Sequence, residues 1–256
     1  MITIKTKEEI DILREGGKRH AYILAELAKM VKPGLSSWDL ENRAFELIKE
    51  GGDSSAFLNY KPYGAKRPYP ATICVSVNDE VVHGIPNEEE KILQEGDVVS
   101  IDLGLVHKGL ITDAAVTVPV GTIAPELSKL LDVTEKALYA GIKMAKDGKK
   151  TGDIGQAISR FAYSNNYGLV EELAGHGVGY SVHEDPYVPN YGEAGKGDTL
   201  KAGMVIAIEP MFNLGTRNIK LDKDGYTFRT ADGKPSAHFE HTVVITKSGA
   251  EILTKI

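Results

Sequence analysis

Residues 96–104 read Gly96-Asp97-Val98-Val99-Ser100-Ile101-Asp102-Leu103-Gly104, and the prediction of the fold begins with this stretch. Its β-branched residues lie between glycines that signal turns, and a second apolar run follows Gly109, so the two runs predict a β-hairpin. Asp102 and Asp113 would then lie on otherwise apolar strands. A buried carboxylate is costly unless it is paired or binds a metal ion, but a lone Asp is more often exposed or part of a turn.

A second copy of this pattern changes the interpretation. Residues 201–210 read Lys201-Ala202-Gly203-Met204-Val205-Ile206-Ala207-Ile208-Glu209-Pro210, so that Asp102 and Glu209 each follow a glycine by six residues. The partner strand is repeated as well, because residues 113–118 resemble residues 240–245 and both runs begin with a carboxylate. If the two copies pack about a pseudo-twofold axis, the four carboxylates converge. This arrangement predicts a metal site, most simply one for two ions.

The predicted helices follow the same duplicated order. Apolar periodicity and capping residues predict helices over residues 6–31, 38–50, 125–146 and 151–166. Each helix pair precedes one copy of the strand and carboxylate pattern, and no long linker interrupts the chain. We therefore expect a single catalytic α+β domain over residues 1–256, with pseudo-repeats of about 1–120 and 121–256.

Composition limits the classes of partner. The 256-residue chain carries a net charge of −6, which argues against nucleic acid as a main partner. The single cysteine, Cys74, excludes an intramolecular disulfide framework and a cysteine-based zinc finger. The N-terminal residues have no apolar signal core, and no segment has the length and apolarity of a membrane span. We expect a cytoplasmic protein that binds neither nucleic acid nor membrane.

Histidines precede the carboxylate strands in both halves. His83-Gly84-Ile85-Pro86 and His183-Glu184-Asp185-Pro186 stand at matching places, and His176 lies within Gly175-His176-Gly177-Val178-Gly179. A lone histidine is more often structural, but two at matching places predict a shared cleft. The glycine-rich run lacks the Lys-Ser/Thr pair of a phosphate-binding loop. His176 is therefore expected to be a metal ligand or a substrate contact.

Together these motifs resemble type I methionine aminopeptidase, of peptidase family M24. The resemblance rests on Val82-His83-Gly84-Ile85-Pro86, Asp102, Thr112-Asp113, Gly175-His176-Gly177-Val178-Gly179, His183-Glu184, Ile208-Glu209-Pro210 and Glu240-His241-Thr242. It implies the pita-bread fold, an α+β fold with two pseudo-twofold related halves around antiparallel sheet. It also implies removal of the initiator methionine from nascent proteins and peptides whose second residue is small.

The resemblance also implies a ligand set for two divalent metal ions. Its members are Asp102, Asp113, His176, Glu209 and Glu240. Asp113 and Glu240 would bridge the ions, Asp102 would bind one of them, and His176 with Glu209 would bind the other. A metal-bridged hydroxide would attack the first peptide bond, and Glu209 would carry the proton to the departing amine. Four carboxylates with one imidazole suit Co, Mn, Fe and Zn alike.

The substrate contacts come from the same resemblance. His83 and His183 would not bind metal; one would stabilise the reacting peptide group and the other would contact the next residue. The pocket for the methionine side chain would be lined by Tyr69, Cys74, Tyr226 and His83. Ordinary core packing explains Cys74 and Tyr226 equally well. Val182 stands where the family often has a large aromatic residue, which predicts a wider pocket.

Two alternatives to this function stay open. One is a related aminopeptidase of the Xaa-Pro type, although the chain has no room for the extra N-terminal domain of those enzymes. The other is a non-catalytic binding protein on the same fold, although all five ligand types are present. The expected partners are the N-termini of peptides and nascent polypeptides. We expect a monomer, and the sequence leaves association with the ribosome open.

Overall fold

The computed structural model describes residues 2–255, and its helices agree closely with the predicted ones. They are α1 (Lys7–Met30), α2 (Ser37–Glu50), α3 (Pro125–Met144) and α4 (Thr151–Ser164). The first begins with a capping box, in which Thr6 accepts a hydrogen bond from the Glu9 backbone and Glu9 accepts one from the Thr6 backbone. Within residues 2–255 no helix combines the length and the apolarity needed to cross a membrane.

The strands of residues 2–255 divide among four sheets, one of which is built on the predicted hairpin. In chain order they are β1 (Ser54–Ser55), β2 (Cys74–Val77), β3 (Glu80–Val82), β4 (Val98–His107), β5 (Leu110–Pro119), β6 (Gly168–Leu169), β7 (Ala174–Gly177), β8 (Glu184–Pro189), β9 (Val205–Ile208), β10 (Met211–Asn213), β11 (Ile219–Leu221), β12 (Phe228–Thr230), β13 (Ser236–His238), β14 (His241–Ile245) and β15 (Ala250–Ile252). The sheet orders are β1-β4-β2 with β5 paired to β4, then β15-β14-β9-β7-β8, β13-β10-β6 and β11-β12-β3.

The register of the strands explains how the carboxylates come together. In the β4–β5 hairpin Asp102 lies opposite Ala115, and Asp113 lies opposite Gly104, so the two carboxylates are two positions apart across the pair. In the other large sheet β9 pairs with β14, with Ile208 opposite His241. Glu209 and Glu240 directly adjoin this last pair of residues. The predicted pairing of a carboxylate-bearing strand with its partner is therefore present in both parts of the chain.

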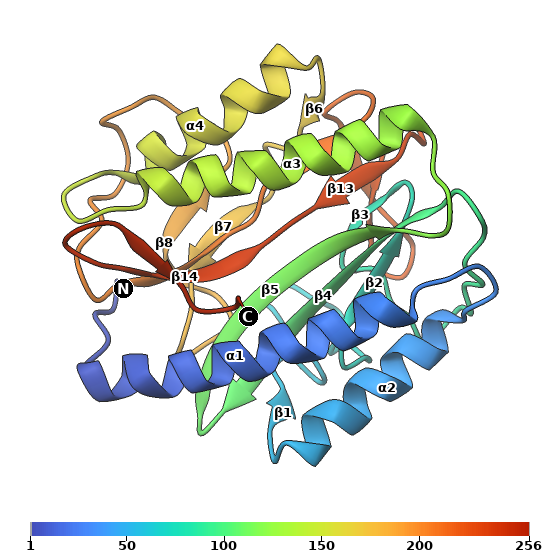
Figure 1. Ribbon diagram of the computed structural model, residues 1–256, viewed down its shortest axis with the longest axis horizontal. Coiled ribbons are helices and arrows are strands. Elements are labelled where there is room, and N and C mark those ends of the chain that lie inside the picture. Colours follow the sequence, from blue (N-terminus) through green and yellow to red (C-terminus); the bar gives the residue numbers. More distant parts are fainter. Residues whose placement is uncertain (1, 256) are drawn as a thin grey trace.

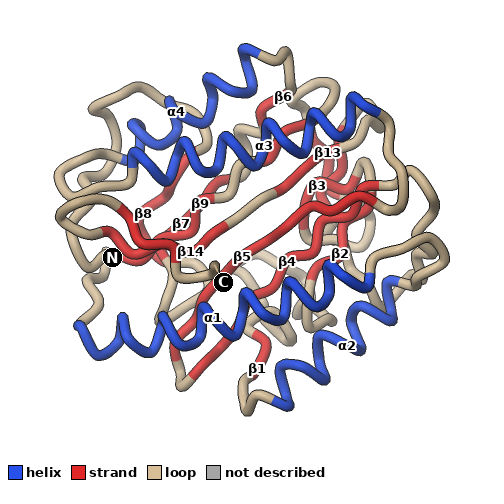
Figure 2. Tube along the Cα trace, viewed as in Figure 1, coloured by secondary structure: helices blue, strands red, loops and turns tan. Residues whose placement is uncertain are grey.

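The helices cover the sheets in two groups, each with its own apolar core. Figure 1 shows α1 and α2 beside β4 and β5, and α3 and α4 beside the strands of the second large sheet. In Figure 2 most of the strands appear between the pair α1 and α2 and the pair α3 and α4. Leu27 of α1 and Leu40 of α2 pack in one core with β4. Leu130 of α3 and Ile158 of α4 pack in another core with β9 and β14. The α+β class is confirmed.

A seam of hydrogen bonds joins the two large sheets. The Glu240 backbone N–H donates to the Ala115 carbonyl at 2.9 Å, and the Ala115 N–H donates to the Glu240 carbonyl at 3.4 Å. Two residues away along each segment, the Thr242 hydroxyl accepts from the Asp113 N–H at 2.8 Å and donates to the Asp113 carbonyl at 2.7 Å. These contacts fix β5 against the segment that carries Glu240. The division into pseudo-repeats of about 1–120 and 121–256 stays a prediction.

Candidate metal centre and adjoining pocket

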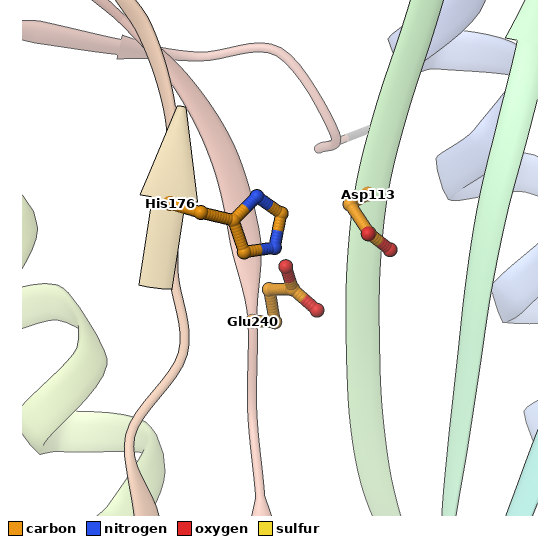
Figure 3. A group of neighbouring side chains, drawn as sticks. All are labelled: Asp113, His176 and Glu240. Carbon is orange, nitrogen blue, oxygen red and sulfur yellow. The ribbon is translucent and has the colours of Figure 1, made fainter. Parts of the chain in front are cut away.

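Three candidate ligands from separate parts of the chain lie together at the seam. One ligand atom from each of Asp113, His176 and Glu240 falls within 4.8 Å of the others. The three residues are 4%, 9% and 3% exposed, respectively. Figure 3 shows that they extend from different segments into the region between β7 and β5. A buried group of two carboxylates and an imidazole at this spacing has the composition of a metal site.

The other two predicted ligands belong to the same cluster. Asp102 and Glu209 line one cavity with Asp113, His176 and Glu240. The Nε2 atom of His176 lies 3.4 Å from Oε1 of Glu209. The structure therefore brings together all five residues that the sequence analysis selected. They come from β4, β5 and β7, from the residue after β9, and from the residue before β14.

The protonation state of the His176 ring is fixed by its backbone contact. Its Nδ1 lies 2.9 Å from the Gly177 carbonyl oxygen, which can only accept a hydrogen bond, so Nδ1 carries the proton. The lone pair of Nε2 is then directed toward the carboxylates. Burial, with a smaller effect of His183, lowers the pKa of His176 to about 3. The neutral ring is thereby the form present near pH 7, as metal binding requires.

The carboxylates repel one another inside this buried site. Burial raises the pKa of Asp102 to about 7. Burial and the charge of Asp102 raise the pKa values of Asp113 and Glu209 well above the ordinary range, and burial with the charge of Asp113 does the same for Glu240. Like charges at close range cannot all ionise unless a positive charge is placed among them.

Unpartnered oxygens test whether divalent ions suit the cluster. Oδ1 of Asp102, Oδ1 of Asp113 and Oε1 of Glu240 are buried and have no hydrogen-bond partner among residues 2–255. Buried polar atoms are nearly always partnered, so such a group of exceptions needs an explanation. Four carboxylates and one neutral imidazole match the oxygen and nitrogen donors of divalent transition metals. The residues fit the predicted metal ions.

The predicted pocket residues line the same cavity as the carboxylates. They are Tyr69, Cys74, His83, Val182, His183 and Tyr226. Tyr69 is held by its hydroxyl, whose single proton is shared between the carbonyls of Ile73 at 3.1 Å and Gly84 at 3.0 Å. The Tyr69 and Tyr226 rings meet edge to face with centroids 5.1 Å apart. One side of the cavity is therefore apolar and aromatic while the other carries the carboxylates.

Both predicted non-ligand histidines face this cavity. His83 has φ 60°, a conformation that non-glycine residues adopt rarely and that often occurs at functional sites. Burial, followed by the proximity of His183, lowers the pKa of His83 to about 4. His183 stacks edge-on against His176 with centroids 4.5 Å apart, and burial lowers its pKa as well. Both rings are neutral near pH 7.

The loop that carries His183 is tied to the N-terminal segment. Nζ of Lys5 lies 2.7 Å from Oε2 of Glu184, and the two side chains are 0% and 8% exposed. Thr3 donates to the same carboxylate oxygen at 2.6 Å. The other oxygen of Glu184 accepts from the backbone N–H groups of Tyr180 and Ser181. The residue next to His183 is thus anchored on both of its carboxylate oxygens.

Some residues of the site were missed by the sequence analysis. Phe57 and Tyr60 line the cavity, and the Tyr60 hydroxyl lies 2.9 Å from Nδ1 of His183. The aromatic run between residues 57 and 63 was a signal for them. His238 lies 3.7 Å from Glu209 and 3.9 Å from Glu240. Since residues two apart on an extended strand face the same side, its spacing from Glu240 was a signal too.

Known proteins resemble the chain over its whole length. Metallopeptidase family M24 matches residues 11–247. Methionine aminopeptidase of Aquifex aeolicus is 46% identical over 100% of this chain and 99% of its own, and methionine aminopeptidase 1 of Bacillus subtilis is 44% identical over 100% of both. The crystal structure of methionine aminopeptidase from Thermotoga maritima superposes with a TM-score of 0.94 and 44% identity, covering 100% of both chains.

More distant structures share the fold alone. The Xaa-Pro dipeptidase of Bacillus anthracis superposes with a TM-score of 0.78 at 22% identity, covering 99% of this chain and 62% of that one. The likeness to the Thermotoga and Bacillus structures confirms the predicted pita-bread architecture. At this identity the dipeptidase carries no information on the substrate of the present chain.

Proposed function

The chain belongs to metallopeptidase family M24, and from this we propose that its clustered carboxylates and His176 form a dinuclear metal centre. Its full-length relatives are methionine aminopeptidases, and the chain is a metal-dependent aminopeptidase of that kind, which removes the N-terminal methionine from peptides and proteins. The observation that carries the proposal is the group of buried, unpartnered carboxylate oxygens facing the lone pair of His176.

The proposed ligand roles follow the positions of the side chains. Asp113 and Glu240 lie at the seam between the two large sheets and are proposed to bridge both ions. Asp102 on the hairpin is proposed to bind one ion, and Glu209 with His176 the other. Divalent ions held there supply positive charge among the carboxylates and Lewis acidity toward water and the peptide carbonyl. The ligand set suits Co, Mn, Fe and Zn alike.

Glu209 is proposed to carry the proton to the departing amine. In the metal-free protein, burial and the nearby Asp102 raise the pKa of its carboxyl group, so this side chain accepts a proton more readily than an ordinary carboxylate. A general acid must lie within hydrogen-bond reach of the group that it protonates, and Glu209 lines the cavity. The same side chain can therefore hold a proton at one oxygen and release it toward the substrate.

His83 and His183 are proposed to act as neutral hydrogen-bond donors to the peptide. Their lowered pKa values leave the rings uncharged, so an N–H can donate to the reacting peptide group without a competing charge. Tyr60 fixes the His183 ring through Nδ1, which leaves Nε2 for the substrate. One ring would stabilise the reacting group, and the other would contact the backbone of the second residue.

The apolar side of the cavity is proposed to bind the methionine side chain. Tyr69, Cys74 and Tyr226 are all less than one-tenth exposed, and they present two aromatic rings and a sulfur to the cavity. Sulfur and aromatic groups make favourable contacts with a thioether. Val182 is packed into the same wall, where its small side chain leaves room for larger or branched residues. We propose a preference for methionine, with the pocket wider than an aromatic residue would allow.

The remaining assignments are also proposals. We propose that the substrates are the N-termini of peptides and nascent polypeptides whose second residue is small, and that the protein acts in the cytoplasm as a monomer. The net charge of −6 supports the expectation that nucleic acid is not a partner. The number of ions bound, expected to be two, is to be measured directly by metal analysis of the reconstituted protein.

Peptide cleavage after metal reconstitution tests the function. Chelator-treated protein would be titrated with Mn²⁺, Co²⁺ and Fe²⁺ and assayed with Met-Ala-Ser, Leu-Ala-Ser and Met-Pro-Gly. We expect metal-dependent release of methionine from Met-Ala-Ser, with slower release of leucine. Fast cleavage restricted to Met-Pro-Gly would favour the Xaa-Pro type of enzyme. Metal binding without any cleavage would favour a binding protein on this fold.

A further inference from the structure

His238 is a buried histidine for which the proposed reaction has no role. Its side chain is 2% exposed, and neither ring nitrogen has a hydrogen-bond partner among residues 2–255. A buried imidazole with both nitrogens unpartnered is rare, because each lost hydrogen bond to water must be replaced within the protein. The two unpartnered nitrogens of this ring therefore need an explanation.

Hydrogen bonds hold the main chain at His238, and they fix the position from which its ring extends. Its backbone N–H donates to the Thr117 hydroxyl at 2.9 Å, and the same hydroxyl donates to the His238 carbonyl at 2.6 Å. β13 places His238 opposite Met211 of β10, two residues after Glu209. The strand pairing thus sets the ring beside the end of β9 and the segment leading to Glu240.

The ring faces the oxygens of two carboxylates. Nε2 of His238 lies 3.7 Å from Oε2 of Glu209 and 3.9 Å from Oε2 of Glu240. Nε2 of His176 lies 3.4 Å from the other oxygen of the same carboxylate, Oε1 of Glu209. Glu209 therefore has two imidazoles near it, each close to a different carboxylate oxygen.

We propose that His238 is a positioning residue that donates a hydrogen bond from Nε2 to Oε2 of Glu209. This inference rests on the proposed function, in which Glu209 binds metal and carries a proton. Oε2 of Glu209 is the nearer of the two acceptors at 3.7 Å, so the proposed hydrogen bond requires the two groups to approach by about 0.5 Å or more. Residues that do not bind the metal but donate hydrogen bonds to its ligands orient those ligands and change the affinity for the metal.

Two matched substitutions separate hydrogen bonding from packing. His238→Gln keeps an N–H donor of similar reach, whereas His238→Leu fills comparable space without a donor. Loss of a hydrogen bond to a metal ligand typically weakens metal binding about 10- to 100-fold. We expect the leucine variant to bind Mn²⁺ about 10-fold or more weakly than the unaltered protein, and the glutamine variant to bind within a few-fold of it.

Isothermal titration calorimetry with Mn²⁺ measures the affinities of the two variants. The visible spectrum of the Co²⁺-loaded protein shows whether residue 238 donates a hydrogen bond to a ligand or itself binds the metal. We expect the spectrum of His238→Gln to match the unaltered protein, whereas His176→Gln, which removes a proposed ligand, should change it. Circular dichroism and the melting temperature of each metal-free variant show whether it is folded.

Several results would overturn the inference. If His238→Gln binds as weakly as His238→Leu and alters the Co²⁺ spectrum, His238 is itself a ligand. If both variants bind Mn²⁺ like the unaltered protein, the ring does not position Glu209. If the unaltered chain binds no metal, the proposed function itself fails. If the unaltered chain binds metal but the variants do not differ from it, only the role of His238 fails.

Discussion

Removing the Lys5 ammonium should destabilise the protein by several kcal/mol, although Lys5 lies outside the metal cluster. The pair formed by Lys5 and Glu184 is almost completely buried, with side chains 0% and 8% exposed. Removing one partner of a buried pair costs about 3–5 kcal/mol, because the other charge stays buried without its partner. Glu184 retains hydrogen bonds from Thr3 and from two backbone N–H groups, which favours the lower end of this range.

The substitution Lys5→Met keeps most of the side-chain volume and removes the charge. A loss of about 3 kcal/mol corresponds to a drop in melting temperature of roughly 6–12 °C for a domain of this size. The measurement is thermal unfolding followed by circular dichroism at pH 7 in chelator, so that metal binding does not contribute to stability. Turnover of Met-Ala-Ser should also fall, because Glu184 adjoins His183.

The matched control is a pair of the same chemistry on the surface. Lys136 and Asp132 are 63% and 55% exposed, and exposed pairs contribute about 0–1 kcal/mol. Lys136→Met should therefore leave the melting temperature nearly unchanged. The double variant Lys5→Met with Glu184→Gln should recover part of the lost stability, since no charge remains buried.

The pH dependence gives an independent check on the same pair. Burial acts to raise the pKa of Glu184, but hydrogen bonds from Lys5, Thr3 and the backbone outweigh it and lower the pKa below the ordinary value. The stabilisation is therefore present above the unfolded pKa and is lost as the pH falls through the folded pKa. A melting temperature of Lys5→Met equal to that of Lys136→Met, or a double variant no more stable than Lys5→Met, would refute this reasoning.

Four further outcomes are expected. Burial raises the pKa of Asp102 from 3.8 to about 7, so the folded protein holds this proton at a pH where the unfolded chain has lost it. The free energy of unfolding of the metal-free protein should therefore fall by about 2–3 kcal/mol as the pH rises from 5 to 8. Asp102→Asn should flatten that dependence in denaturant titrations. Glu240→Ala should abolish Mn²⁺ binding and peptide cleavage in a chain that still folds, and full activity would exclude it as a bridging ligand. His183→Ala should lower turnover while metal analysis finds the same content, and loss of one ion would identify it as a ligand. Val182→Phe should raise the ratio of methionine to leucine release, and an unchanged ratio would show that this wall does not set selectivity.

Much of the fold could be predicted because it depends on local periodicity and on repetition. The apolar spacing of residues 6–31 predicted α1, and the glycine-bounded runs predicted the β4–β5 hairpin. The four candidate carboxylates could be chosen because Asp102 and Glu209 occupy equivalent places in two similar runs, whereas the choice of His176 as a ligand rested on the resemblance to type I methionine aminopeptidase. Repetition provides a check that a single motif lacks, since two unrelated strands have no reason to carry a carboxylate at the same position.

The contacts that the sequence did not reveal are those between distant segments. Lys5 and Glu184 are 179 residues apart, and neither residue type is expected to be buried. Tyr60 belongs to a loop with no periodicity, so its approach to His183 depends on the packing of the whole chain. His238 had a signal in its spacing from Glu240, but a lone histidine is ordinarily interpreted as structural. The partners of such residues become known only from the tertiary contacts.

The seam between β5 and Glu240 has a consequence for how proteins of this architecture can diverge. Its central pair of hydrogen bonds joins the main chains of Ala115 and Glu240, and main-chain groups are the same whatever side chains they carry. Mutation can therefore replace pocket residues such as Val182 without altering the distance between the two sheets. Evolution can in this way explore new substrates while inheriting an unchanged spacing of the carboxylates.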